Sequence, residues 1–308
     1  MTYAMSAGFR QAELLVFEKN FIRVAQQTDS KLLATPAIHH VDIKGISNMS
    51  TIESIELTEV TSAGSNPDKQ YAEMTARNRK SVQRRFTKTY LFDDYDKCVN
   101  LITDPTSDLF KNLGEAKNRM ADRCIADSAI APVVIGGPQE AGTTYTAAQD
   151  GVVTIAGTTA FNYSTVISPA ITQFENNYID CANGVTLAIS ANEEESLRND
   201  DKYMNALYSN QNTVDKGKIT NASGFNVVTF AGSKNGGTTI TNPILKENEG
   251  TRTNLLLAPD SIAFALEIGR LDCTKSATKV NSWEVTIDMW VKAVRREGKR
   301  VIILTSTI

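Results

Sequence analysis

An α+β fold is predicted from three features of this 308-residue sequence. A charged, extended segment over residues 84–97 leads directly into a long capped helix. Strand-like and helix-like segments then alternate over residues 184–280, and the chain returns to extended structure after residue 282. The length suits about two domains of ordinary size. We therefore expect a long helix that lies across a sheet, together with an α/β portion.

The composition is that of an ordinary globular protein, with 41% hydrophobic and 22% charged residues. Lysine and arginine total 32 against 35 acidic residues, so the net charge of −3 gives the whole chain no electrostatic basis for tight nucleic-acid binding. The start of the sequence lacks the pattern of a secretory signal, and no apolar run approaches 18 residues. A soluble protein made in the cytosol, without membrane contact, is expected.

Metal-binding and catalytic patterns are absent from the sequence. The four cysteines, at positions 98, 124, 181 and 273, form no C-x-x-C pair, and buried thiols in a reducing cytoplasm are expected. The only histidines, His39 and His40, are neighbours whose side chains would point to opposite sides of an extended segment.

No G-x-S-x-G, H-E-x-x-H or kinase signature occurs, and the glycine-containing run at residues 231–237 lacks the ending of a phosphate-binding loop. Paired acids such as Asp93 and Asp94 are more typical of a surface than of acid/base catalysis. Neither an enzyme nor a bound cofactor is expected.

The first segment carries four apolar residues at helical spacing, which predict an amphipathic arm that ends near residues 28–30. Such an arm must dock on its own core or on a neighbour. The apolar positions are Leu14, Phe17, Phe21 and Val24.

Two extended segments, over residues 49–60 and 82–92, predict a long polar two-stranded projection, with a loop over residues 61–80. Acids mark the first segment, and six basic residues fall between positions 77 and 88 without one acid. These charges form either solvated faces or complementary pairs within a hairpin or between subunits. Because acids follow closely, subunit contact is favoured over a nucleic-acid strip. The acids are Glu53, Glu56 and Glu59, and the basic residues are Arg77, Arg79, Lys80, Arg84, Arg85 and Lys88.

A helix of about 26 residues, or about 39 Å, is predicted from Asp104 as N-cap and Pro105 as first helical residue to Ala131. Its apolar stripe comprises Leu109, Phe110, Leu113, Ala116, Met120, Ala121, Cys124 and Ile125.

The remaining elements are predicted from turn residues and periodicity. A surface hairpin is expected over residues 141–159 with its turn at Asp150-Gly151, and the period-two segment 283–293 is expected to pair with 301–304 in another hairpin. Strands are expected at residues 185–190, 225–230 and 254–258, and helices at 192–208 and 261–270. A further helix is expected to begin at Ser168-Pro169 and to be closed by Asn183-Gly184, with Ile171, Phe174, Tyr178 and Cys181 on one face.

The order of these elements resembles the major capsid protein of tailed double-stranded-DNA phages, with the Hong Kong 97-like fold. The resemblance is carried by Arg84-Arg-Phe-Thr-Lys-Thr-Tyr90, Asp93-Asp-Tyr-Asp-Lys97, Leu101-Ile-Thr-Asp-Pro-Thr-Ser107 and Arg119-Met-Ala-Asp122. It implies four parts: an N-terminal arm over 1–40, an extended loop over 41–97, a peripheral domain with the spine helix over 98–183 and 281–308, and an axial domain over 184–280.

The resemblance implies a protein that assembles in the host cytoplasm into hexamers and pentamers of an icosahedral virion capsid. The implied partners are further copies, a separate scaffolding protein, a portal, in some cases a decoration protein, and packaged double-stranded DNA bound without sequence preference. An encapsulin-type shell that holds protein cargo and a phage tail or baseplate component are the alternatives. The expected interface residues are Leu14, Phe17, Phe21, Val24, Glu53, Glu56, Glu59, Arg84, Arg85, Lys88, Asp93 and Asp94.

Overall fold

The structure is a computed structural model that describes residues 27–41, 49–55, 76–93, 106–136, 141–157, 161–181, 184–201, 214–215, 218–219, 221–222, 225–230, 247–248 and 251–307. The chain clusters into two compact units. The first holds the described residues of 27–30, 84–121 and 266–291, and the second holds those of 31–83, 122–265 and 292–307. Three long elements, α3 (Thr106–Ile130), β15 (Ile262–Lys275) and β16 (Ser282–Arg295), have residues in both units.

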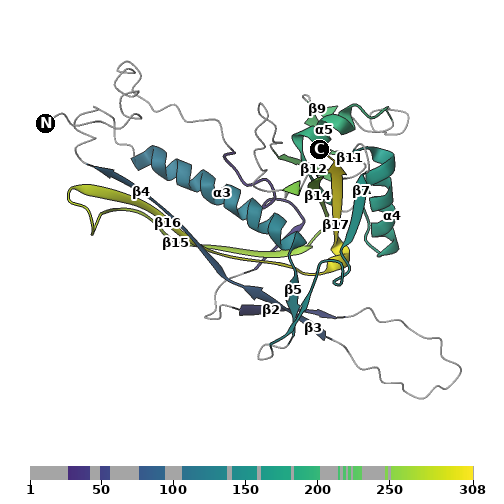
Figure 1. The fold of residues 1–308 in the computed structure, drawn as a ribbon, viewed down its shortest axis with the longest axis horizontal. Coiled ribbons are helices and arrows are strands. Elements are labelled where there is room, and N and C mark those ends of the chain that lie inside the picture. The colour runs from purple at the N-terminus through teal and green to yellow at the C-terminus, as the bar shows by residue number, and fades with distance from the viewer. Residues whose placement is uncertain are drawn as a thin grey trace, which may run out of the picture. The chain divides into compact units, whose positions relative to one another are not determined.

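The first unit packs α3 against a sheet in which β4 (Arg84–Asp93) runs antiparallel to β16. The whole sheet has the order β1-β15-β16-β4, and β1 (Ile38–His40) pairs in parallel with the start of β15. Figure 1 shows α3 running beside β4, β15 and β16. The small core of this unit consists of Leu113, Val285 and Ile287, with Tyr90, Leu109, Phe110 and Cys273 packed on it.

The long helix is confirmed over Thr106–Ile130, 25 residues. Its predicted stripe is the buried side, because Leu113, Ala121, Cys124 and Ile125 are all buried. Pro132 lies two residues after Ile130, and proline disfavours a helical conformation in the residue before it, which accounts for the end of the helix at Ile130.

The second unit contains a mixed sheet of seven strands. Six of them have the order β11-β12-β8-β14-β17-β7, and the seventh, β13, pairs with β14. A π-helical turn at Tyr163–Ile167 continues directly as α4 (Ser168–Asn176), and the core of the unit lies between these two elements and the sheet. Residues of α5 (Ala191–Arg198) also contribute to this core. Figure 1 shows α4 beside β7 and β17. The strands are β7 (Val153–Gly157), β8 (Thr186–Ser190), β11 (Asn221–Ala222), β12 (Phe225–Phe230), β13 (Glu247–Asn248), β14 (Thr251–Leu257) and β17 (Val301–Thr307).

A second sheet of this unit has the order β2-β3-β5-β6. Its strands are β2 (Met49–Ile55), β3 (Ala76–Val82), β5 (Val133–Ile135) and β6 (Thr143–Tyr145). The short pair β9 (Val214–Asp215) and β10 (Lys218–Ile219) and a 3-10 turn at Gly298–Arg300 complete the described elements.

The predicted two-stranded projection is wrong in its pairing. The first strand, β2, pairs with β3, and β4 pairs with β16 instead. Residues 76–80, predicted as loop, belong to β3. A basic run with only one hydrophobic residue, such as Arg77-Asn-Arg-Lys-Ser-Val82, carries little strand signal, and its strand conformation depends on the ladders with β2 and β5.

The helix predicted over residues 261–270 is also wrong, because this segment is the first part of β15. Alanine, leucine and glutamate favour helix, and Pro259-Asp260 looks like a helix start. Instead Asp260 adopts a left-handed turn conformation with φ 54°, and Ile262, Ala263 and Phe264 pair with β1. Sheet pairing therefore overrides local propensity here.

Both predicted hairpins have the right strands but the wrong partners. The turn at Asp150-Gly151 exists, with Gly151 at φ 94°, yet β6 pairs with β5 whereas β7 pairs in parallel with β17. Likewise β16 and β17 lie in different sheets. The strands at residues 185–190, 225–230 and 254–258 are confirmed as β8, β12 and β14, with bounds that agree to within three residues.

The two later helices begin where predicted. α4 starts at Ser168 but ends at Asn176, so its predicted end at Asn183-Gly184 is wrong. Phe174 is buried, whereas Tyr178, predicted on the same face, lies beyond the helix and is exposed. α5 starts at Ala191 with Glu193 and Glu194 in its first turn. Its predicted continuation over residues 202–208 lies outside the described residues. Among the helices that the structure describes, none is both long and apolar enough to cross a bilayer.

Candidate subunit interface and buried ion cluster

The charged strand β4 presents different side chains on its two faces. Directly opposed residues of an antiparallel pair share a face, so Arg84 and Lys88, opposite Val291 and Ile287, lie on the face that α3 covers. Arg85, opposite Trp290, lies on the other face. The predicted interface arginines are therefore divided between two surfaces.

Arg85 has a carboxylate partner within its own chain. Its Nε donates to Oδ1 of Asp288 at 2.8 Å and its Nη2 to Oδ2, and its guanidinium lies over the Trp290 ring. The hydrogen bond from Arg85 holds the pKa of Asp288 below its ordinary value. Gly269 makes room for this arrangement, since a Cβ there would lie 1.9 Å from the ring of Trp290.

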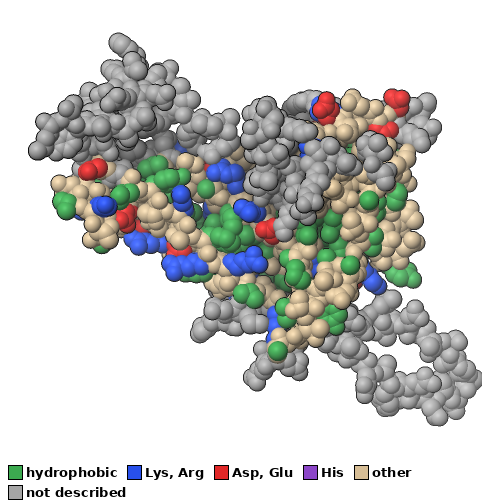
Figure 2. Space-filling model, in the orientation of Figure 1, with side chains coloured by type: hydrophobic (Ala, Val, Ile, Leu, Met, Phe, Trp, Pro, Cys, Tyr) green, Lys and Arg blue, Asp and Glu red, His purple; other side chains and the backbone are tan. Residues whose placement is uncertain are grey.

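The other predicted residues that the structure describes lie on β2 and β4. Arg84 and Lys88 are exposed, and Lys88 is 5.6 Å from the centroid of the Tyr90 ring. Asp93 is half-buried opposite Ser282, and Glu53 is opposite Asn78 in the β2–β3 ladder. Figure 2 shows Lys and Arg side chains along the surface over β4, β15 and β16. Leu14, Phe17, Phe21, Val24, Glu56, Glu59 and Asp94 lie outside the described residues.

The Arg119-Met-Ala-Asp122 motif of α3 holds backbone that lies within the predicted N-terminal arm. The buried Asp122 carboxylate accepts hydrogen bonds from the backbone N–H of Lys31 at 2.9 Å and of Leu32 at 3.0 Å. Arg119 Nη1 donates to the carbonyl of Gln27, and Asn118 Nδ2 to that of Thr28. The motif thus attaches residues 27–32 to the helix.

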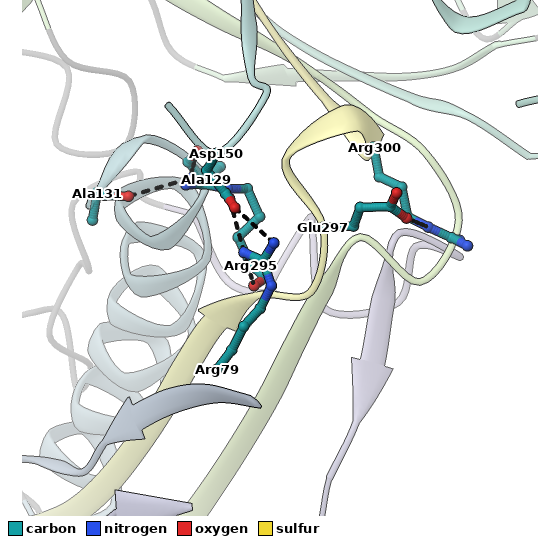
Figure 3. Close-up of polar contacts among 7 residues, drawn as sticks. All are labelled: Arg79, Ala129, Ala131, Asp150, Arg295, Glu297 and Arg300. Atoms are coloured by element: carbon teal, nitrogen blue, oxygen red, sulfur yellow. Dashed lines mark hydrogen bonds and ion pairs between the residues drawn. The ribbon is translucent and has the colours of Figure 1, made fainter. Parts of the chain in front are cut away.

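A buried ion cluster, formed by Arg79, Asp150 and Arg295, was not predicted (Figure 3). Arg79 Nη1 and Nη2 donate to the two oxygens of Asp150 at 2.8 and 2.6 Å, and Arg295 Nε donates to Asp150 Oδ2 at 2.8 Å. The three side chains are 5%, 2% and 0% exposed. Arg79 comes from β3, Asp150 from the turn before β7, and Arg295 from the end of β16.

The cluster carries two positive charges and one negative charge, and the end of α3 supplies further negative potential. Arg295 Nη1 donates to the carbonyls of Ala129 at 2.7 Å and Ala131 at 3.2 Å. Carbonyls at the C-terminal end of a helix have no hydrogen-bond partner within the helix, so they can accept from this side chain. The helix dipole gives that end roughly half a negative charge. Burial nevertheless lowers the pKa of Arg295, against the opposing effect of the Asp150 carboxylate. The cluster joins the middle of β3 to the end of the long helix.

A second buried polar group lies where β8 passes into α5. Glu193 accepts a hydrogen bond from Ser306 Oγ at 2.7 Å, contacts Ser190 Oγ and pairs with Arg252 at 3.3 Å. The two glutamates of the predicted acidic first turn are therefore buried, and Glu193 is paired with Arg252. Their negative charges also interact favourably with the helix dipole.

The histidines and cysteines show no arrangement for chemistry within the described residues. His39 faces Asp260 at 3.5 Å on the surface, and no cluster of three metal-ligating side chains occurs there. Cys124 and Cys181 are buried free thiols. Burial, together with Glu175 and Asp180, raises the pKa of Cys181 to about 11.

Comparison with known proteins gives a single family. The family model described as phage capsid protein matches residues 9–307. None of the curated proteins matches the sequence.

The solved structures show the same fold at low sequence identity. The chain is similar to the capsid of cyanophage P-SCSP1u (11% identity, 94% of this chain and 93% of that one, TM-score 0.61), the head of Helicobacter pylori bacteriophage KHP40 (10%, 94% and 93%, 0.65) and the capsid of Ralstonia phage GP4 (11%, 94% and 94%, 0.65).

Proposed function

The chain belongs to the phage capsid protein family, and on that premise we propose that its copies tile an icosahedral phage head as hexamers and pentamers that enclose double-stranded DNA. As a major capsid protein it is structural and not an enzyme. The observation that carries the proposal is the family match over almost the whole chain, together with the capsid fold of the similar structures.

The finer architecture that we propose is the Hong Kong 97-like one. In it, residues 1–40 form the N-terminal arm, 41–97 the extended loop, 98–183 with 281–308 the peripheral domain, and 184–280 the axial domain. The α3 helix beside the β4-containing sheet supports this assignment, as does the polar β2–β3 pair that precedes β4.

The interface that we propose is built on β4. Within the described residues this strand pairs along one edge only, with β16, and it carries Arg84 and Lys88 exposed on one face. We assign these two cations to carboxylates of a neighbouring subunit, and Arg85 to holding β4 on β16 through Asp288. Glu53, Glu56, Glu59, Asp93, Asp94 and the stripe Leu14, Phe17, Phe21 and Val24 are proposed to complete the contacts.

Many weak and repeated contacts can hold such a shell, because each subunit is restrained by several neighbours at once. The partners that we propose are a scaffolding protein, a portal, a decoration protein in some heads, and DNA packed without sequence preference. The net charge of −3 agrees with weak DNA contact.

Expression of the full chain, with and without its phage's other head proteins, tests the proposal by electron microscopy and by analysis of the packed contents. Closed particles of icosahedral symmetry are expected, filled with DNA when they are isolated from phage. Tubes, discs or a protein that stays monomeric in both settings would contradict it, and particles that carry an enzyme in place of DNA would indicate a nanocompartment.

A further inference from the structure

Tyr178 combines an unusual backbone conformation with an exposed aromatic ring. Its φ is 61°, in the left-handed region, and its side chain is 87% exposed. A tyrosine is unfavourable for the subunit on both counts, because a Cβ disfavours this conformation and an exposed ring leaves apolar surface in water.

The backbone around Tyr178 explains why a left-handed residue is required there. Helix α4 ends at Asn176, and the N–H of Tyr178 donates to the carbonyl of Glu175 at 3.0 Å while that of Ile179 donates to Phe174 at 2.9 Å. These two hydrogen bonds form the Schellman motif, whose left-handed position is usually glycine or asparagine. A tyrosine occupies that position here.

Two acidic residues lie near Tyr178 along the chain. Glu175 and Asp180 are both exposed and flank Tyr178 in the sequence. Their negative potential is felt by the neighbouring thiol, since they add to the effect of burial in raising the pKa of Cys181. A tyrosine ring within an acidic surface is a favourable site for a cation, because the ring face and the carboxylates attract the same charge.

We propose that Tyr178 is an anchor between copies of this chain, and that its ring receives an arginine or lysine side chain of a neighbouring subunit, with Glu175 as the charged partner. Interface anchors are typically aromatic residues in the centre of a contact. Residues with a Cβ in the left-handed region also occur frequently at functional positions. The occupant is a second copy because the chain belongs to a family of shell proteins, so this inference depends on the proposed self-assembly.

The variant Tyr178→Gly separates the two properties of the residue. Glycine adopts the left-handed conformation without strain, so the unassembled subunit should unfold at the same temperature or a higher one. The ring is lost, so the free-subunit concentration at which shells form should rise about tenfold or more. Tyr178→Phe keeps the ring and should assemble like the unaltered chain.

A matched control is available at Asn281, which is also left-handed, with φ 55°. Asn281→Gly removes a left-handed side chain elsewhere and should leave shell formation unchanged. Glu175→Lys reverses one flanking charge and should raise the assembly concentration as Tyr178→Gly does. Light scattering and electron microscopy measure assembly, and calorimetry below the assembly concentration measures stability.

Three results would overturn the inference: shells of Tyr178→Gly at the unaltered concentration, a lowered unfolding temperature for that variant, or normal shells that fail only to bind another head protein. If the unaltered chain forms no shells, the proposed function itself fails. The two failures are therefore distinguishable.

Discussion

Asp150 is the only carboxylate in contact with the two buried guanidiniums of Arg79 and Arg295 among the described residues. Arg79 Nε and Arg295 Nη2 have no hydrogen-bond partner there, so the cluster already has spare donors. Buried ion pairs contribute little net stability when complete, but removal of one partner leaves unpaired charge in a medium of low dielectric constant. The cluster should therefore be sensitive to loss of its one acid.

Asp150→Asn should lower the free energy of unfolding by about 3 to 5 kcal/mol, since two buried cations lose their counter-charge. Urea denaturation of the unassembled subunit measures this. Glu297→Gln provides the control, because the Glu297–Arg300 pair is 3.0 Å long but roughly half exposed, and its loss should cost at most about 1 kcal/mol. Equal effects of the two variants would argue against a special role for the buried cluster.

The Arg85–Asp288 pair predicts a specific dependence on pH. Because hydrogen bonding from Arg85 lowers the folded-state pKa of Asp288 below its ordinary 3.8, this pair contributes stability above about pH 4. That contribution is lost as pH falls through the lowered folded-state pKa, where the carboxylate becomes protonated. Arg270 acts in the same direction.

Asp288→Asn should consequently be less stable than the unaltered chain at pH 7, and the difference should shrink as the pH is lowered below about 4. Unfolding free energies measured between pH 2 and pH 7 for both proteins test the sign. A difference that grows on acidification would contradict the assignment.

At the scale of elements, α3 has residues in both units and makes a different kind of contact in each. Leu113 belongs to the core of the first unit, whereas Asp122 holds the backbone of Lys31 and Leu32 in the second. The helix is thus both a packing surface and an attachment for residues 31 and 32 of the predicted arm.

Asp122→Asn tests this attachment, since an amide oxygen cannot supply two charged acceptors to two backbone donors. A loss of about 1 to 3 kcal/mol is expected. Hydrogen exchange should become faster at the amides of Lys31 and Leu32, with little change in the core strands. The control Asp127→Asn, which alters a more exposed carboxylate one turn further along, should leave both amides protected; fast exchange in that variant also would indicate general loosening of α3.

For the whole molecule, the question is which exposed charges serve assembly and which serve the subunit. Arg84 and Lys88 lie on one face of β4, and Arg85 is paired with Asp288 on the other. Reversal of all three charges would confuse folding with assembly. Reversal of the two cations on one face should act on assembly alone.

Arg84→Glu combined with Lys88→Glu should abolish shells while it leaves a folded subunit, because each proposed carboxylate partner would then face a like charge. Electron microscopy and circular dichroism measure the two outcomes. The exchange Arg85→Asp with Asp288→Arg keeps the internal pair and the net charge, and should still form shells. Normal particle yield from the double reversal would refute the interface on β4.

The elements that could be predicted from the sequence are those specified by neighbouring residues. The long helix follows from its apolar spacing and from the prolines at its two ends, and β8 and β12 follow from short runs of strand-forming residues. The resemblance to the capsid family could also be recognised from the sequence, because the motifs that carry it are short and continuous.

The pairing of strands and the buried ion cluster were decided by contacts between distant parts of the chain. Asp150 looks like an ordinary turn residue, yet it meets Arg79 and Arg295 from 71 and 145 residues away. Residues 261–270 have a composition that favours helix. They nevertheless form the first part of β15, because this segment can make backbone hydrogen bonds to β1 on one side and to β16 on the other. Local sequence expresses local preference, whereas partner choice and the burial of charge depend on free energies that arise only when remote segments pack together.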